Sequence, residues 1–174
     1  MNRTRLTITY LTTLLLFCFG CDTGLAPLNE PSGFSGTIHF KNWPSADSVR
    51  DLRLVAFESF PTDSGGIFLT LLTGRAAVFP SDLTSKGSLP KFVDSASYVC
   101  NTKGAINLKV QEYGYVVVAQ RYGPNSFTDW KPAGVYTTQP NSFVPAPVRV
   151  LLHRIAPNIN IQVDFRNPPP KPWQ

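Results

Sequence analysis

Cysteine, histidine and charge are all scarce in this sequence, and each scarcity argues against a class of function. Of its 174 residues only three are cysteines and two are histidines, and 16% are charged. No cysteine pair could hold zinc, and no acidic loop supplies the closely spaced oxygen ligands that calcium needs. The basic residues stand singly, whereas a nucleic-acid interface needs a basic stripe or cluster. We therefore expect no metal, no cofactor and no nucleic-acid partner, despite a pI of about 9.3.

A long membrane-spanning run is also missing, and the most apolar stretch lies at the start of the chain. Arg3 and Arg5 precede a mostly apolar segment that is broken by threonines and ends at Gly20 and Cys21. A transmembrane helix needs about 20 predominantly apolar residues. A short positive start, an apolar stretch and a small residue at the exit are instead the three parts of a secretory signal peptide.

The pair Gly20-Cys21 at the end of this segment resembles the lipobox of bacterial lipoproteins. The resemblance implies cleavage before Cys21, a diacylglyceryl group on its thiol, and acyl chains such as palmitate that hold the protein to a membrane. Ordinary secretion with cleavage near Gly20 and an uncleaved anchor are the two alternatives. We expect a lipid-anchored protein of the bacterial cell envelope, at the outer membrane or cell surface before the inner membrane, and leave the leaflet open.

The rest of the chain divides into a tether, one domain and a tail. We interpret residues 1–20 as the signal peptide, 21–33 as a flexible tether rich in Pro, Gly and Asn, and 34–166 as a single domain. Residues 167–174 are rich in proline and predict a polyproline II tail. Because the signal segment accounts for the other two cysteines, Cys100 stands alone, and we interpret it as a small buried hydrophobe rather than a reactive thiol.

Within the domain, apolar and polar residues alternate with a period of two between Gly/Pro-rich turns. The clearest case is 158–165, which has one apolar and one polar face. Segments 51–60 and 113–122 are apolar on both faces, and we predict that 113–122 is the central strand. With 35–40 and 148–153, the chain contains seven to nine short strands. This predicts an all-β fold, a single Ig-like or transthyretin-like sandwich or a barrel.

Segment 67–79 is the hardest to assign. Ile67 and Leu71 would share a helical face, but Gly74 interrupts the pattern and Pro80 ends it. Periodicity alone cannot separate a short buried strand from a short helix. We expect a strand over this segment.

Two further features are predicted from turn residues. Segments 96–100 and 105–110 flank a turn at 101–104, which predicts a hairpin. Residues 123–134 are expected to form a loop, followed by a short edge strand at 135–138. Both predictions rest on local composition.

Part of the chain resembles a known sandwich family. Asn107-Leu108-Lys109-Val110, then Gly114-Tyr115 leading into 116–119, then Tyr122-Gly123, are similar to the carboxypeptidase regulatory-like, or transthyretin-like, repeat. Gly36-Thr37-Ile38 fits its opening strand. The whole chain also resembles small uncharacterised lipoproteins of diderm bacteria. The resemblance implies a sandwich that acts as an accessory or binding module, and it implies no reaction.

Catalytic residues are not indicated by any motif. His39 and His153 both lie in strand patterns, and 33–36 is one residue short of a Gly-x-Ser-x-Gly elbow. We expect no enzyme. The alternatives are a small secreted or envelope hydrolase, which needs one of these histidines near an acid and a serine, and a carrier of apolar ligands, which needs a lined cavity.

Aromatic residues are the best candidates for a binding patch. Tyr122, Phe127, Trp130 and Tyr136 crowd one loop and its ends, and Trp43 lies on another loop. Exposed aromatic rings beside polar groups stack on sugars or anchor a protein partner. Alternatively, Trp130 folds back as a plug over the end of the core, which we favour for this residue. The sequence thus predicts a membrane-anchored envelope lipoprotein that serves as a non-catalytic binding or scaffold module for a protein or glycan.

Overall fold

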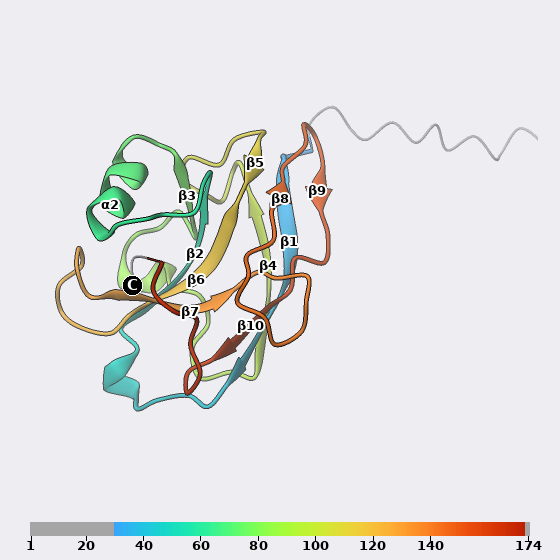
Figure 1. Cartoon of the computed structure of the whole chain (residues 1–174). Helices are drawn as coiled ribbons and strands as arrows, with labels where there is room; N and C mark the ends of the chain where they lie inside the picture. Colours follow the sequence, from blue (N-terminus) through green and yellow to red (C-terminus); the bar gives the residue numbers. More distant parts are fainter. Residues whose placement is uncertain (1–29, 173–174) are drawn as a thin grey trace, which may run out of the picture.

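Two β-sheets pack face to face in the computed structural model of this chain, which describes residues 30–172 (Figure 1). The signal segment, Cys21 and most of the tether lie outside these residues. The first sheet contains β1 (Gly33–Lys41), β4 (Ser95–Asn101), β9 (Ile155–Ala156) and β10 (Ile161–Asp164). The second sheet contains β3 (Ala76–Phe79), β2 (Asp51–Phe57), β6 (Tyr115–Arg121) and β7 (Trp130–Val135), in that order. The prediction of an all-β sandwich is confirmed.

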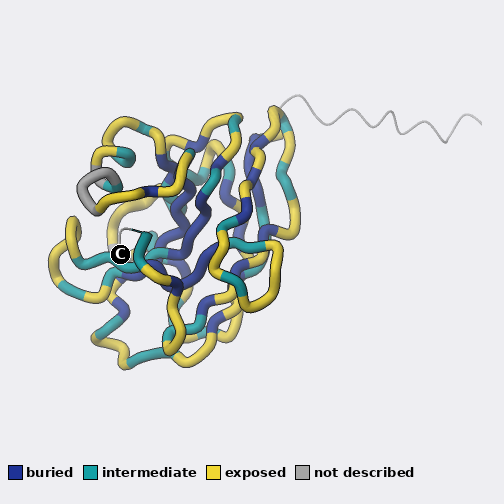
Figure 2. Tube along the Cα trace, in the orientation of Figure 1, coloured by how far each residue is buried: buried dark blue, intermediate teal, exposed yellow. Residues whose placement is uncertain are grey.

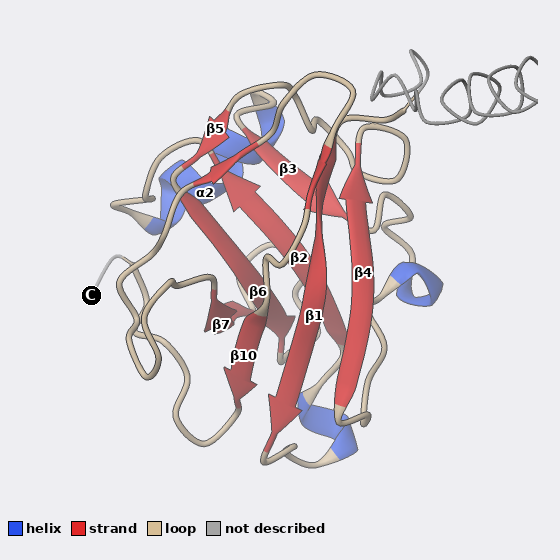
Figure 3. Cartoon of the chain, turned by 90° about the vertical axis from the view of Figure 1, so that its right-hand side faces the viewer, coloured by secondary structure: helices blue, strands red, loops and turns tan. Residues whose placement is uncertain are grey.

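The remaining elements are short. Strands β5 (Glu112–Tyr113) and β8 (Val148–Arg149) form a two-stranded ribbon, and α2 (Ser64–Leu72) is the one α-helix of residues 30–172. Two 3₁₀ turns, η2 (Ala46–Ser48) and η3 (Ser85–Gly87), lie in the connections. Figure 3 shows the long strands of both sheets.

The main core lies between the two sheets, where Figure 2 shows a buried interior. Strand β10 turns Ile161 and Val163 inward and leaves Gln162 exposed, as its alternating sequence predicts. Strand β2 is buried along its whole length because both faces of the second sheet are covered. Strand β6 is hydrogen-bonded to β2 on one side and β7 on the other, so its prediction as a central strand is confirmed.

The expected strand over 67–79 is wrong for its first half, where α2 runs to Leu72 and β3 begins only at Ala76. Ile67 and Leu71, one helical turn apart, pack on the outer face of the second sheet against a cluster that includes Val55 and Val117. That face is apolar and needs a cover. A short amphipathic helix supplies it, since the first sheet already occupies the other face.

The predicted hairpin at 96–110 is also wrong, although its turn forms. The Asn101 side-chain oxygen accepts hydrogen bonds from the backbone N–H groups of Lys103 and Gly104, which closes the turn. Beyond it the chain leaves the first sheet, and Ile106 pairs with Val78 at the edge of β3. Strand β4 pairs with β1 instead, so the turn joins two sheets and not two neighbouring strands.

The predicted loop at 123–134 ends earlier than expected, because β7 occupies Trp130–Val135. Pro132 made this strand hard to predict from the sequence, because proline has no backbone N–H to donate to a neighbouring strand. It is tolerated because β7 is the last strand of its sheet and the register shifts between Val118 and Ala119 of the facing strand. The edge strand therefore exists, several residues before its predicted position.

Candidate functional site

The direction of β1 defines two ends of the sandwich. The chain joins the sandwich at Gly33, and β1 then runs nine residues to Lys41, a length of about 26 Å. Strand β10 is parallel to β1, so Asp164 lies beside Lys41 and the two strands finish at the same end (Figure 3). We call this the distal end, since it is opposite the point where the chain enters from Cys21.

A hollow of about 430 Å³ lies at the distal end, and we call it the distal groove. Its volume is within the range of about 300–1,000 Å³ that is usual for small-ligand sites. The groove is assembled from the connection after β1, the ends of β6 and β7, the residue after β10, and the C-terminal segment. Its lining consists of Pro44, Ser48, Gln120, Tyr122, Lys131, Phe165 and Lys171.

The alternation of β6 directs two of these side chains into the groove. Val116 and Val118 face the main core, and Gln120 follows on the same face. Tyr122 continues the series one residue beyond the strand. Lys131 is the cross-strand partner of Gln120 on β7 and so shares that face. At the end of the two sheets, the apolar side chains of this face are therefore followed by the amide of Gln120, the phenol of Tyr122 and the ammonium group of Lys131.

Gln120 is a polar side chain with only 1% of its surface exposed. Its Nε2 donates a hydrogen bond to the Ser48 carbonyl oxygen at 2.6 Å, which fixes the orientation of the amide. Its Oε1 is buried and has no hydrogen-bond partner among residues 30–172. An unsatisfied buried acceptor costs about 1–3 kcal/mol. Because the oxygen is buried, a donor in the groove would reach it, and remove that cost, only after neighbouring side chains shift.

The charged groups of the lining are both cationic. Lys131 Nζ lies 5.8 Å from the centre of the Tyr122 ring, within the range of a cation–π contact. Lys171 comes from the C-terminal segment, which returns to the sandwich with Pro169 buried. In the part of the chain that the structure describes, no ion pair neutralises either ammonium group. The groove is therefore positively charged.

The predicted aromatic patch is distributed over several places. Tyr122, 41% exposed, lines the groove. Phe127 is 74% exposed in the β6–β7 connection. Trp130 is half-buried, opposite Arg121 in the register, and its indole N–H donates to the Ser126 carbonyl oxygen at 2.8 Å. Tyr136 packs against the main core.

Trp43 is the aromatic residue that closes the distal end of the core. Its ring centre lies 4.5 Å from that of Phe165 and 4.9 Å from those of Phe40 and Phe92, and its N–H donates to the Val93 carbonyl oxygen. This is the plug role that the sequence suggested for Trp130. Trp43 therefore packs against Phe165, which in turn lines the groove.

Sequence reasoning missed Gln120, Phe165 and Lys171 as lining residues. Gln120 has a local signal, since it is a polar residue on the apolar inner face of a buried strand. Phe165 belongs to the alternating pattern of 158–165, so its side chain was expected on the apolar face of that strand. Lys171 has no local signal, because its place depends on how the proline-rich segment folds back.

The two histidines lie apart from the groove lining. His39 is exposed on β1. His153 donates its backbone N–H to Ser32 Oγ, and its ring Nδ1 lies 3.2 Å from the Glu30 carbonyl oxygen. Among the described residues, no hydrogen bond or ion pair joins either imidazole to a carboxylate. The geometry that a hydrolase requires is not observed in residues 30–172.

Cys100 and the acidic residues offer no reactive or metal-binding cluster in residues 30–172. Cys100 is buried in the core, and burial raises the pKa of its thiol to about 12. No group of three or more His, Cys, Asp or Glu side chains in this range could hold a metal ion. The candidate site is therefore the distal groove.

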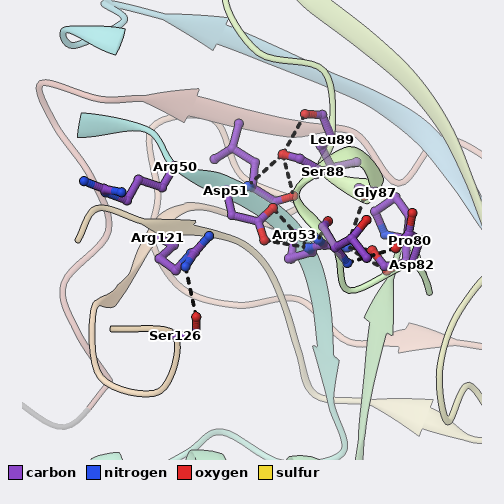
Figure 4. Close-up of polar contacts among 12 residues, drawn as sticks. Arg50, Asp51, Arg53, Pro80, Asp82, Gly87, Ser88, Leu89, Arg121 and Ser126 are labelled. Carbon is purple, nitrogen blue, oxygen red and sulfur yellow. Dashed lines mark hydrogen bonds and ion pairs between the residues drawn. The ribbon is translucent and has the colours of Figure 1, made fainter. Parts of the chain in front are cut away.

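A buried polar cluster around Arg53 has a structural role (Figure 4). The Arg53 guanidinium, with Arg53 3% exposed, donates from Nε and Nη2 to the Asp51 carboxylate at 3.0–3.2 Å. Its two terminal nitrogens also donate to four backbone carbonyls of the connection that follows β3, those of Pro80, Asp82, Thr84 and Gly87. Every nitrogen of this guanidinium donates a hydrogen bond, so the cluster attaches the connection after β3 to the second sheet.

Comparison of the chain with protein-family models, curated proteins and solved structures finds no match in any of the three. No helix within residues 30–172 is long and apolar enough to cross a membrane. What the structure defines is an all-β sandwich with a cationic, aromatic-lined groove at its distal end.

Proposed function

We propose that this protein is a bacterial envelope lipoprotein, anchored through Cys21, whose sandwich binds an envelope protein or glycan in the distal groove without catalysing a reaction. The observation that carries the proposal is the position of the groove. It lies beyond the end of β1, a strand of about 26 Å, that is opposite Gly33, where the chain from Cys21 joins the sandwich. A lipid at Cys21, joined to the sandwich through the flexible tether expected at 21–33, would leave this end free to face away from the membrane.

The composition of the groove supports recognition. Its lining combines an aromatic ring, an amide and two ammonium groups with the apolar side chains of Pro44 and Phe165. Such mixtures hold ligands by stacking and by a few directed polar contacts. Ser48 and Tyr122 are the two hydroxyl side chains of the lining. The lining contains no histidine that could act as a general base for the Ser48 hydroxyl.

The anchor is tested by the intact mass of the protein extracted from native membranes. We expect a chain that begins at Cys21 and carries a diacylglyceryl group, with or without an N-acyl chain. A Cys21→Ser variant should stay unmodified. A soluble, unacylated wild-type product would contradict the anchoring half of the proposal.

The binding half is tested by co-sedimentation of the detergent-solubilised full chain with insoluble envelope material from the native cell. We expect wild-type protein to sediment and Tyr122→Ala to remain in solution. Phe143→Ala is the matched control, because Phe143 is also 41% exposed but lies outside the groove lining. Protease treatment of the envelope material separates a protein ligand from a glycan. Equal sedimentation of wild type and Tyr122→Ala would refute a role for the groove.

A further inference from the structure

We infer that the ligand of the distal groove is an anionic sugar, a glycan unit that carries a carboxylate or phosphate group. The inference rests on the proposed function, since it names the ligand class of the same groove. Three features of the lining lead to it: two ammonium groups, an exposed aromatic ring, and a buried acceptor without a partner.

The charge of the ligand follows from Lys131 and Lys171. They come from β7 and from the C-terminal segment, so the fold brings together two cations that are far apart in the sequence. Neither has an ion-pair partner among residues 30–172, and the lining contains no carboxylate. Like charges gathered in one hollow repel each other, and an anion between them removes that repulsion. Ammonium groups hold carboxylates and phosphates through charge-assisted hydrogen bonds.

The ring of the ligand follows from Tyr122 and its apolar neighbours. The Tyr122 ring is 41% exposed, and the side chains of Pro44 and Phe165 line the same hollow. The C–H face of a sugar ring packs on such surfaces, while its hydroxyl groups keep polar contacts at the edge. A bare inorganic anion would use the lysines and leave these apolar side chains without a partner.

The hydroxyl groups of the ligand follow from Gln120. Its Nε2 is occupied by the Ser48 carbonyl oxygen, so only Oε1 is left, and Oε1 can only accept. It therefore needs a donor, which a carboxylate or phosphate anion does not provide. A sugar hydroxyl supplies one, and because Oε1 is buried, it does so once neighbouring side chains shift to admit it or a bridging water molecule. An acidic sugar is the ligand chemistry that contains the anion, the ring face and the donor together.

The aromatic and apolar side chains of the lining favour a glycan over the anionic headgroup of a lipid. The headgroup of phosphatidylglycerol carries a phosphate and hydroxyl groups but has no ring that could pack on Tyr122, Pro44 and Phe165. Its soluble form, glycerophosphoglycerol, therefore serves as the competing source of the same charge.

The experiment measures binding of the full chain, in detergent, to three probes by calorimetry. The first probe is a galacturonic acid oligosaccharide, and the second is the same oligosaccharide with its carboxyl groups methyl-esterified. The third is glycerophosphoglycerol, the soluble headgroup of phosphatidylglycerol. We expect the acid to bind, and both the ester and glycerophosphoglycerol to bind at least about tenfold more weakly. The affinity for the acid should also fall as salt is added.

Three variants locate the binding. Lys131→Gln and Lys171→Gln should each weaken binding of the acid by about tenfold. Lys103→Gln removes the same charge from an exposed turn beyond β4 and should leave binding unchanged. Circular dichroism spectra that match wild type would show that the variants fold.

The outcomes are distinguishable. Equal binding of acid and ester, equal effects of the three lysine substitutions, or binding of glycerophosphoglycerol alone would each overturn the anionic-sugar inference. If no probe binds but wild-type protein sediments with envelope material in a Tyr122-dependent manner, the proposed function stands and this inference fails. Loss of that sedimentation dependence would contradict the proposed function itself.

Discussion

Replacing Arg53 by methionine tests whether the buried cluster stabilises the sandwich. Methionine keeps an unbranched apolar stem but removes the guanidinium, and with it the ion pair to Asp51 and the donors for four backbone carbonyls. The Asp51 side chain, 7% exposed, would then remain as a buried charge without its partner. The connection after β3 would also lose its attachment to the second sheet.

The expected loss can be estimated from the burial of the pair. Breaking a buried ion pair by removal of one partner costs about 3–5 kcal/mol. The four carbonyls add little, because the connection can move outward and let water reach them. For a domain whose unfolding free energy is about 5–15 kcal/mol, this is a large fraction. With a urea dependence of about 2 kcal/mol per molar, the midpoint should fall by about 2 M.

The assay is urea unfolding of the full chain in detergent, followed by tryptophan fluorescence. Trp43 is a suitable reporter because it packs among Phe40, Phe92 and Phe165 at the end of the core. The matched control is Arg75→Met, since Arg75 pairs with Glu58 at 3.2 Å but its side chain is 60% exposed. An exposed pair contributes about 0–1 kcal/mol, so its midpoint should shift little.

Two results would refute the reasoning. A midpoint for Arg53→Met that matches that of Arg75→Met would show that the cluster adds no stability. The second concerns the double variant Asp51→Asn/Arg53→Met, which no longer contains the stranded carboxylate. We expect it to recover part of the lost free energy, and a further fall would mean that the buried charge is not the cause.

The remaining predictions concern a close backbone approach and the lone thiol of the core. A Cβ on Gly36 would lie 2.2 Å from the Ile159 carbonyl oxygen, so Gly36→Ala should lower the unfolding free energy by about 1–3 kcal/mol. The control is Gly104→Ala, where the nearest atom would be 3.4 Å from the new Cβ, and it should change the unfolding free energy by less than about 0.5 kcal/mol. Equal urea midpoints for these two variants would contradict the packing of β1 against the segment before β10. Cys100 should resist iodoacetamide at pH 8 in the folded chain and react in urea, because burial raises the pKa of its thiol to about 12. Peptide mapping that finds Cys100 alkylated at the same rate in both states would show that the thiol is accessible.

Local patterns in the chain were sufficient for the main strands and the fold class. The period-two alternation of 158–165 identified the buried face of β10, and the doubly apolar run at 113–122 identified β6 as a central strand. Both are consequences of the strand geometry, in which successive side chains point to opposite faces. The turn at 101–104 was likewise visible, because Asn101 and Gly104 suit a tight turn.

Tertiary structure decided which segments meet. Strand β1 pairs in parallel with β10, more than 100 residues away, and Ile106 pairs with Val78 instead of continuing a hairpin. Segment 67–72 became a helix because the outer face of the second sheet lacked a cover. None of these outcomes is contained in a local pattern, since each depends on which faces and edges the rest of the fold leaves open.

The distal groove shows the same division. The sequence by itself pointed to Tyr122 as a candidate binding residue and to Gln120 as part of a buried strand. It did not bring Lys131 and Lys171, or Phe165 and Pro44, into one groove, because these residues come from separate segments that converge only where the two sheets end. A strand pattern determines which way a side chain points, whereas the long-range packing of the sheets determines what it points at.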